Sequence, residues 1–279
     1  MYNKFLVVAS KNDPAAVNIC SQLNQFRRNP FLTGMSPEAR GFDFYLIDDD
    51  VLHEENLDMG KIEKYDFVVF ASKHESTDKE KALTVHTPGN PREEEPIAGG
   101  KRGKISRGSG VFLKQIYNNL RNLAYEHHLS KDYKVTMEAT HHGPLIDKPC
   151  IFIEIGATKR EWEDKRAGFV LAKTISRTVE NFEFNPYNEV AVGIGGPHYC
   201  PGFNKLQRES NVAISHVIPK YCLPVSEEII KEAWNKTEED PEFVVLDWKG
   251  LGPKEQRDEI IEILERNYIP WKKRNEIRR

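Results

Sequence analysis

The sequence has few cysteines and no long apolar run, and these two absences narrow the class of protein it belongs to. Its four cysteines, Cys20, Cys150, Cys200 and Cys222, lie far apart and form no CxxC pair, which argues against a disulfide framework and a thiolate zinc site. No segment approaches the length of a membrane span, and no signal-peptide pattern opens the chain. We therefore expect a soluble, cytoplasmic protein with no membrane partner.

Neither sign of charge dominates. The net charge is −3, so a nucleic-acid partner would have to bind a local basic patch against a weakly repulsive global field. Basic residues gather at the C-terminus, beside Trp271, and in the segment 88–110. The C-terminal group is Lys272, Lys273, Arg274, Arg278 and Arg279, and the other group is Lys101, Arg102, Lys104 and Arg107. We take the latter four as candidate substrate-binding residues, with an ordinary solvated surface as the alternative.

Apolar runs of strand length recur along the chain, and helical patterns separate several of them. Such runs indicate strands covered on both faces, so we predict an α/β fold with a mainly parallel or mixed central sheet flanked by helices. We find no internal repeat and no linker, which favours a single domain over residues 1–279. The expected strands cover 5–9, 44–47, 67–71, 83–86, 134–140, 150–155, 190–194 and 212–217, and the expected helices begin near 14, 111, 158, 226 and 253.

The segment 88–110 differs from the rest of the chain. Its glycines, prolines and dense charges leave little that could pack, and we predict a long mobile loop.

Histidine and glutamate side chains follow several of the predicted strands. Ligands of open parallel sheets bind beyond the carboxyl ends of the strands, so we expect these side chains to meet at one edge of the sheet. They are His74 with Glu75, His86, Glu138 with His141 and His142, Glu154, and His198.

Glu154 interrupts the apolar run 150–155. A carboxylate buried there needs a cation, a metal or a hydrogen-bond donor. We therefore interpret Glu154 as a residue of the functional site, with a structural ion pair to an arginine such as Arg160 as the alternative.

The segment 137–144 contains two adjacent histidines beside an acid. An extended backbone would place Glu138 and His142 on one face and His141 on the other, although the turn at Gly143 could take His142 out of that pattern. Imidazole is a common zinc ligand, and a neighbouring glutamate can orient it or act as a base.

The glycines before His198 form a third candidate segment. The backbone N–H groups of Gly195 and Gly196 could hold a substrate oxygen, although a simple tight turn is the alternative. The sequence contains no HExxH, GxSxG, GxGxxG or P-loop motif. A zinc-protease helix and a nucleophilic serine elbow are therefore not expected.

Together, these segments resemble the archaeal and plant type of D-aminoacyl-tRNA deacylase. The resemblance lies in 138–144, in 154–158 with Glu161 and Trp162, and in 195–199, and the opening strand and 72–74 also fit. It implies a phosphorylase/hydrolase-like α/β fold, zinc dependence, a monomer, and hydrolysis of D-aminoacyl-tRNA to free D-amino acid and tRNA.

Given this resemblance, we expect metal-assisted ester hydrolysis. The candidate catalytic residues are Glu138, Glu154, His142 and His198, with either glutamate as the base, and the candidate ligands of Zn²⁺ are His74, His141, His142 and His198. Two alternatives stay open: a zinc metallopeptidase or nucleoside phosphorylase-like enzyme, and a tRNA-binding protein without catalysis.

Overall fold

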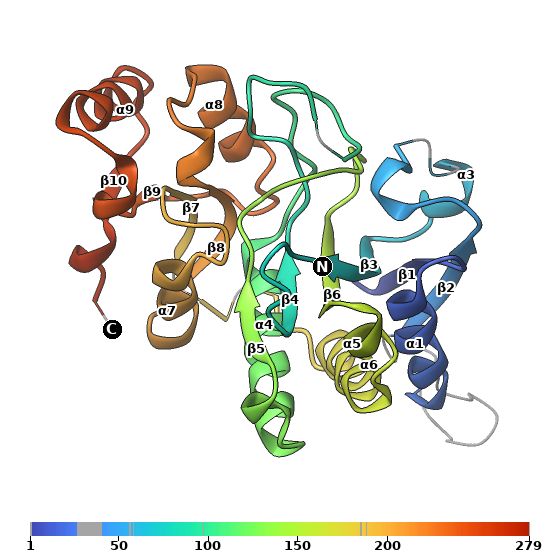
Figure 1. The fold of residues 1–279 in the computed structure, drawn as a ribbon. Coiled ribbons are helices and arrows are strands. Elements are labelled where there is room, and N and C mark those ends of the chain that lie inside the picture. Colours follow the sequence, from blue (N-terminus) through green and yellow to red (C-terminus); the bar gives the residue numbers. More distant parts are fainter. Residues whose placement is uncertain are drawn as a thin grey trace.

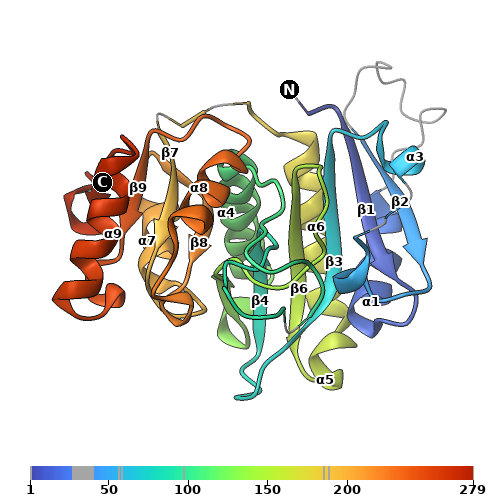
Figure 2. The ribbon, with the colours of Figure 1, turned by 90° about the horizontal axis from the view of Figure 1, so that it is seen from above.

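The computed structural model describes residues 2–26, 41–55, 57, 59–96, 98–184, 186–187 and 189–278. Its strands form two sheets that lie side by side (Figures 1 and 2). The larger sheet has the order β2-β1-β3-β6-β4-β5. Its strands are β1 Lys4–Ser10, β2 Gly41–Ile47, β3 Phe67–Glu75, β4 Ala82–His86, β5 Lys134–Met137 and β6 Cys150–Ala157.

The smaller sheet has the order β10-β9-β7-β8, and its neighbouring strands are parallel. Its strands are β7 Glu189–Ile194, β8 Val212–Ile218, β9 Phe243–Leu246 and β10 Trp271–Lys273. In the larger sheet, neighbouring strands are parallel except that β4 runs antiparallel to β6. The predicted α/β class with a mainly parallel or mixed sheet is therefore confirmed, although the strands divide into two sheets.

Helices connect and cover these strands. They are α1 Pro14–Leu23, α3 Met59–Ile62, α4 Gly110–Glu126, α5 Lys159–Trp162, α6 Lys165–Glu180, α7 Pro201–Glu209, α8 Glu227–Asn235 and α9 Lys254–Arg266. Short 3-10 turns cover Asn24–Phe26, Val51–His53, Leu129–Lys131, Lys220–Cys222, Trp248–Leu251 and Arg274–Glu276. The helix expected from residue 158 is two helices, because Asp164 caps a new one at α6. No helix among the described residues is long and apolar enough to span a membrane.

The two faces of the larger sheet bury different sets of residues. On β3, Phe67 and Val69 pack into the main core with α1, α4 and α6, whereas Val68 and Phe70 face the other side. Since side chains alternate along a strand, Ser72 and His74 continue the second set, away from these three helices. The main core also takes residues of β7 and β8, so α4 and its neighbours are buried against both sheets.

Among the described residues of the segment 88–110, no helix or strand lies before Gly110, as expected, but much of the segment packs. Ile105 and Ser106 are fully buried. The Asn90 N–H donates to the Lys104 carbonyl at 2.8 Å, and the Gly103 N–H donates to the Arg92 carbonyl at 3.0 Å. These bonds fold the segment back on itself, and motion of its tip stays a prediction.

A candidate histidine–carboxylate active site

The candidate site is built on the face of the larger sheet that points away from α1, α4 and α6. Glu154 of β6 lies in register between Ser72 of β3 and Thr84 of β4. Two residues further along β3, His74 lies opposite Gly156. Because β4 is antiparallel to β6, these groups meet on one face rather than at a shared carboxyl edge. The predicted convergence is therefore confirmed, but the geometric reason given for it is wrong.

The segment that follows β5 brings the adjacent histidines to this face. The Ala139 N–H donates to the His198 carbonyl at 2.7 Å, and the Thr140 N–H donates to the Val217 carbonyl at 2.9 Å. These bonds tie the segment to the smaller sheet and end the strand at Met137, before the predicted residue 140.

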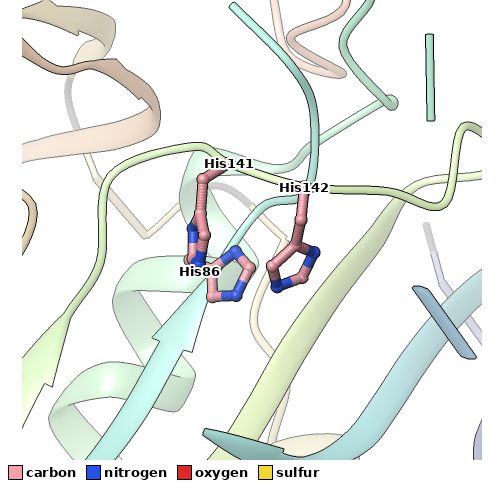
Figure 3. Close-up of side chains that lie close together, drawn as sticks. All are labelled: His86, His141 and His142. Carbon is pink, nitrogen blue, oxygen red and sulfur yellow. The ribbon is translucent and has the colours of Figure 1, made fainter. Parts of the chain in front are cut away.

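Both histidines of this segment turn toward His86 (Figure 3). The ring centroid of His86 lies 4.3 Å from that of His141 and 4.8 Å from that of His142. His142 has a positive φ of 46°, which breaks the alternation expected of an extended strand. Of the two predicted arrangements, the structure has the one in which the turn at Gly143 takes His142 out of the strand pattern, so that His141 and His142 lie together.

Glu138 lies beneath the site and joins two imidazoles. Its Oε1 is 3.1 Å from His74 Nδ1 and 3.0 Å from His198 Nε2. Its Oε2 is buried without a hydrogen-bond partner among the described residues, and His86 Nε2 is 3.8 Å away. Burial alone would raise the pKa of this carboxyl, but the imidazoles of His74 and His198 hold the pKa well below its usual range. Glu138 is therefore a carboxylate.

Glu154 is the second buried acid, and its environment has the opposite effect. Its Oε2 accepts a hydrogen bond from Thr84 Oγ1 at 3.3 Å and lies 3.7 Å from both His74 Nδ1 and His86 Nε2. Burial and the neighbouring Glu138 charge raise the pKa of Glu154 well above its usual range. The neighbours of Glu154 among the described residues are thus a threonine and two histidines. They are not Arg160, the partner in the alternative of a structural ion pair. The two acids thus favour opposite protonation states, a pattern typical of acid–base sites.

Three of the imidazoles favour the neutral form. Burial lowers the pKa of His86 and His141, with neighbouring imidazoles adding to the effect, and burial lowers the pKa of His142 to about 4. Both ring nitrogens of His86 are buried without a hydrogen-bond partner among the described residues. One potential ligand atom from each of His86, His141 and His142 lies within 4.8 Å of the others. Neutral nitrogens that converge in this way fit a metal ion.

Further ligand sets overlap this one. Glu138, His141 and His198 form one set, and His74, Glu138 and Glu154 form another, each with its ligand atoms within 4.8 Å of one another. The structure therefore brings together all four predicted metal-ligand residues and all four predicted catalytic residues.

A cavity of about 590 Å³ opens above this cluster. Its lining includes His74, His141, His142 and Glu154, together with residues 90–92 and Tyr221. A volume of this size accommodates a small organic ligand or the end of a larger one. Of the two buried glutamates, Glu154 therefore lines the cavity, whereas Glu138 does not.

The predicted glycine donors lie outside the lining of this cavity. The Gly195 N–H donates to the Ile218 carbonyl at 2.8 Å, and the Gly196 carbonyl accepts from the Lys220 N–H at 2.8 Å. A Cβ added at Gly196 would lie 3.1 Å from Oδ2 of Asp247, which follows β9. The Gly195 donor is therefore already engaged within the protein.

The predicted basic residues lie on the surface, and several have acidic partners. Arg102 is 3.6 Å from Glu93, Lys104 is 3.3 Å from Glu232, and Arg107 is 3.3 Å from Glu238. Lys101 is exposed. In the C-terminal group, Lys272 pairs with Glu189 at 2.6 Å and Arg274 with Asp247 at 3.5 Å, while Arg279 lies outside the described residues.

Several residues of the site were not predicted from the sequence. His86 was noted after its strand but not chosen as a ligand, and Thr84 was not noted. Tyr199 places its hydroxyl 2.9 Å from His74 Nε2, and Tyr221 places its hydroxyl 3.1 Å from His198 Nδ1. Burial raises the pKa of Tyr199 to about 12 and also raises that of Tyr221, so both hydroxyls keep their protons. Tyr199 directly follows His198, which was an available signal, whereas Tyr221 carries no local one.

The fold and the site together define a class: an α/β protein with a buried histidine–carboxylate centre, open to a cavity and able to hold a metal. Comparison with known proteins makes this assignment specific. Residues 61–272 match the family model described as D-aminoacyl-tRNA deacylase. The chain belongs to this family.

Individual relatives agree over nearly the whole chain. The chain is 32% identical to the D-aminoacyl-tRNA deacylase of Methanocaldococcus jannaschii, over 97% of this chain and 99% of the relative. It is 35% identical to that of Methanosarcina mazei, over 99% and 94% of the two chains. A crystal structure titled a conserved protein of unknown function superposes with a TM-score of 0.85 at 28% identity, covering 99% of this chain and 96% of the other.

Proposed function

We propose that this protein hydrolyses the ester that joins a D-amino acid to tRNA, releasing the free D-amino acid and the tRNA. The observation that carries the proposal is a cavity lined by Glu154, His74, His141 and His142 in a chain of this family. The end of a charged tRNA is an amino acid esterified to a ribose, and a cavity of about 590 Å³ suits such a group better than a folded nucleic acid. The remainder of the tRNA stays on the surface.

Glu154 is the group proposed to move protons. As its ionised form it takes a proton from the attacking water, whose oxygen bonds to the ester carbonyl carbon. It then returns the proton to the ribose oxygen as the carbon–oxygen ester bond breaks. A raised pKa makes this carboxylate a stronger base than an ordinary glutamate. His142 borders this path as a ligand or proton carrier, and Glu138 anchors the imidazoles of His74 and His198.

The product analysis that tests this function uses D-tyrosyl-tRNA with the full-length protein. The expected products are D-tyrosine and intact tRNA. Peptide cleavage or phosphorolysis of a nucleoside by the protein would instead support the alternative enzymes. Binding of the tRNA with the ester left intact would support a binding protein without catalysis.

We further propose that the site holds Zn²⁺, with His86, His141 and His142 as its core ligands. The support is the chemistry of the donor set: three neutral imidazoles and orphaned buried atoms on His86 and Glu138. Bound zinc would acidify a water molecule and polarise the ester carbonyl. We also propose that the protein acts as a monomer.

Elemental analysis tests the zinc proposal. Chelation should abolish deacylation, and His86→Asn should lose the bound metal. His127→Asn is the matched control, because His127 lies at the end of α4 and contacts Lys173 at 3.1 Å. Full activity in a metal-free protein would contradict zinc dependence, and unchanged metal content in His86→Asn would contradict this ligand set.

A further inference from the structure

Two tyrosine hydroxyls lie at the outer ends of a continuous chain of hydrogen-bonding groups. Tyr199 contacts His74, His74 contacts Glu138, Glu138 contacts His198, and His198 contacts Tyr221. Four distances of 2.9, 3.1, 3.0 and 3.1 Å connect these five side chains. Both imidazoles meet the same oxygen, Glu138 Oε1.

This geometry sets which nitrogen of each ring carries the proton. Glu138 Oε1 as a carboxylate oxygen can only accept, so His74 Nδ1 and His198 Nε2 must donate. In a neutral imidazole the remaining nitrogen is an acceptor. The nitrogens that remain are His74 Nε2 and His198 Nδ1, and each faces a tyrosine hydroxyl that can donate.

We propose that Tyr199 and Tyr221 are positioning residues that hold His74 and His198 in opposite neutral tautomers around Glu138 Oε1. His74 carries its proton on Nδ1 and His198 carries its proton on Nε2. The consequence for the reaction rests on the deacylase function proposed above, whereas the tautomers themselves do not.

The arrangement also governs Glu154. His74 Nδ1 lies 3.1 Å from Glu138 Oε1 and 3.7 Å from Glu154 Oε2. With its proton on Nδ1, the ring donates to Glu138 and offers Glu154 no lone pair. In the other tautomer, His74 Nδ1 would carry a lone pair and could accept a hydrogen bond from the protonated Glu154 carboxyl. The ring would then take the place of the water molecule that Glu154 has to bind. Tyr199 therefore acts on the reaction through His74 and Glu154, without lining the cavity.

Tyr221 differs from Tyr199 in its position. It lines the cavity and is 42% exposed, and the His198 side chain is 33% exposed. Water can replace the Tyr221 hydroxyl more readily than that of Tyr199, so loss of the Tyr221 hydroxyl should have the smaller effect on turnover and the larger effect on substrate binding.

Nitrogen-15 NMR of the histidine rings tests the tautomers directly in the full-length protein as purified, at about pH 8. His74→Gln and His198→Gln assign the signals. The expected wild-type spectrum shows a protonated Nδ1 for His74 and a protonated Nε2 for His198. Tyr199→Phe should shift the His74 nitrogens alone, and Tyr221→Phe the His198 nitrogens alone. Tyr133→Phe is the matched control, since it removes a hydroxyl bonded to Asp164 Oδ2 at 3.0 Å outside the chain of groups.

Kinetics supply the second readout. Tyr199→Phe should lower kcat for D-aminoacyl-tRNA by about 10-fold or more while KM changes little, as for other side chains that orient catalytic groups. Tyr133→Phe should retain wild-type kcat. The same tautomer in both histidines, or spectra that neither tyrosine variant alters, would overturn the proposal. A wild-type protein with the expected spectrum but without deacylase activity would contradict the proposed function alone.

Discussion

At the scale of single residues, Glu138 and Glu154 favour opposite protonation states because their neighbours differ. Glu138 contacts two ring nitrogens, whereas Glu154 contacts a hydroxyl and lies beside the Glu138 charge. The sequence allowed the prediction that Glu154 is buried and needs a partner, because it interrupts an apolar run. It could not assign the two states, since these depend on distances between groups 16 positions apart in sequence (138 and 154).

Glu154→Gln tests the role of this residue as the base. The amide keeps the shape of the side chain and removes its acid–base function, so the deacylation rate should fall on the order of 100-fold or more. Glu75→Gln is the matched control, because Glu75 also lines the cavity but is exposed and paired with Lys73. Similar rates for Glu154→Gln and the wild type would make Glu138 the leading base.

The stability of the same variant separates a catalytic role from a structural one. Because the pKa of Glu154 is raised in the folded protein, the unfolded chain loses this proton at lower pH than the folded chain does. Stability from this group is therefore lost as pH rises above the usual carboxyl range. In the metal-free protein, the free energy of unfolding of Glu154→Gln should decline less than that of the wild type between about pH 5 and about pH 8. A large loss of stability at neutral pH would indicate a structural ion pair instead.

At the scale of elements, strand β6 carries Glu154 and also leaves room for His74. A Cβ added at Gly156 would lie 2.4 Å from His74 Cδ2, which is closer than two carbon atoms can approach without contact strain. Glycine at this position therefore leaves room for the His74 side chain to pack against the strand and reach Glu138.

Gly156→Ala should displace the His74 ring and lower kcat by about 10-fold or more, since the group that orients a catalytic side chain typically contributes that much. Gly41→Ala is the matched control in β2, because nothing lies within 4 Å of its added Cβ. Steady-state kinetics and a thermal melt of both variants give the comparison. Wild-type kcat in a folded Gly156→Ala would show that the position of His74 does not limit the reaction.

The elements also show what sequence could and could not predict. The apolar runs predicted the strands from β1 to β8, but β9 and β10 were not predicted. Alternation along β3 and β6 explains why Ser72, His74 and Glu154 share a face. The direction of β4 could not be predicted, because strand pairing depends on contacts remote in sequence. The orientation of His141 could not be predicted either, since the chain leaves the strand at Met137 through bonds to the smaller sheet.

At the scale of the whole molecule, a tRNA must be held by surface outside the cavity. Residues 90–92 line the cavity, and the chain continues from there to Lys101 and Arg102. Arg107 is held away from the cavity. Its side chain pairs with Glu238, and its backbone carbonyl accepts a hydrogen bond from the Cys150 N–H at the start of β6. The four predicted basic residues are therefore not equivalent.

The double variant Lys101→Ala with Arg102→Ala should raise KM for charged tRNA and flatten its dependence on salt, with little change in kcat, because phosphate contacts release counterions. Lys104→Ala with Arg107→Ala is the matched control, since their partners Glu232 and Glu238 are only 17% and 29% exposed, whereas Glu93, the partner of Arg102, is 53% exposed. Deacylation measured over a range of salt concentrations provides the slopes. Equal slopes for the double variant and the wild type would move tRNA binding to another surface, first the group at 272–274.

The measurement that tests the central claim most directly is the single-turnover rate of ester cleavage on D-tyrosyl-tRNA and L-tyrosyl-tRNA, followed with the same preparation of the protein. Because this chain belongs to the D-aminoacyl-tRNA deacylase family and has a cavity lined by histidines and a glutamate, we predict rapid release of D-tyrosine, with L-tyrosyl-tRNA largely spared. Equal rates on the two stereoisomers, or no cleavage of either, would contradict the account.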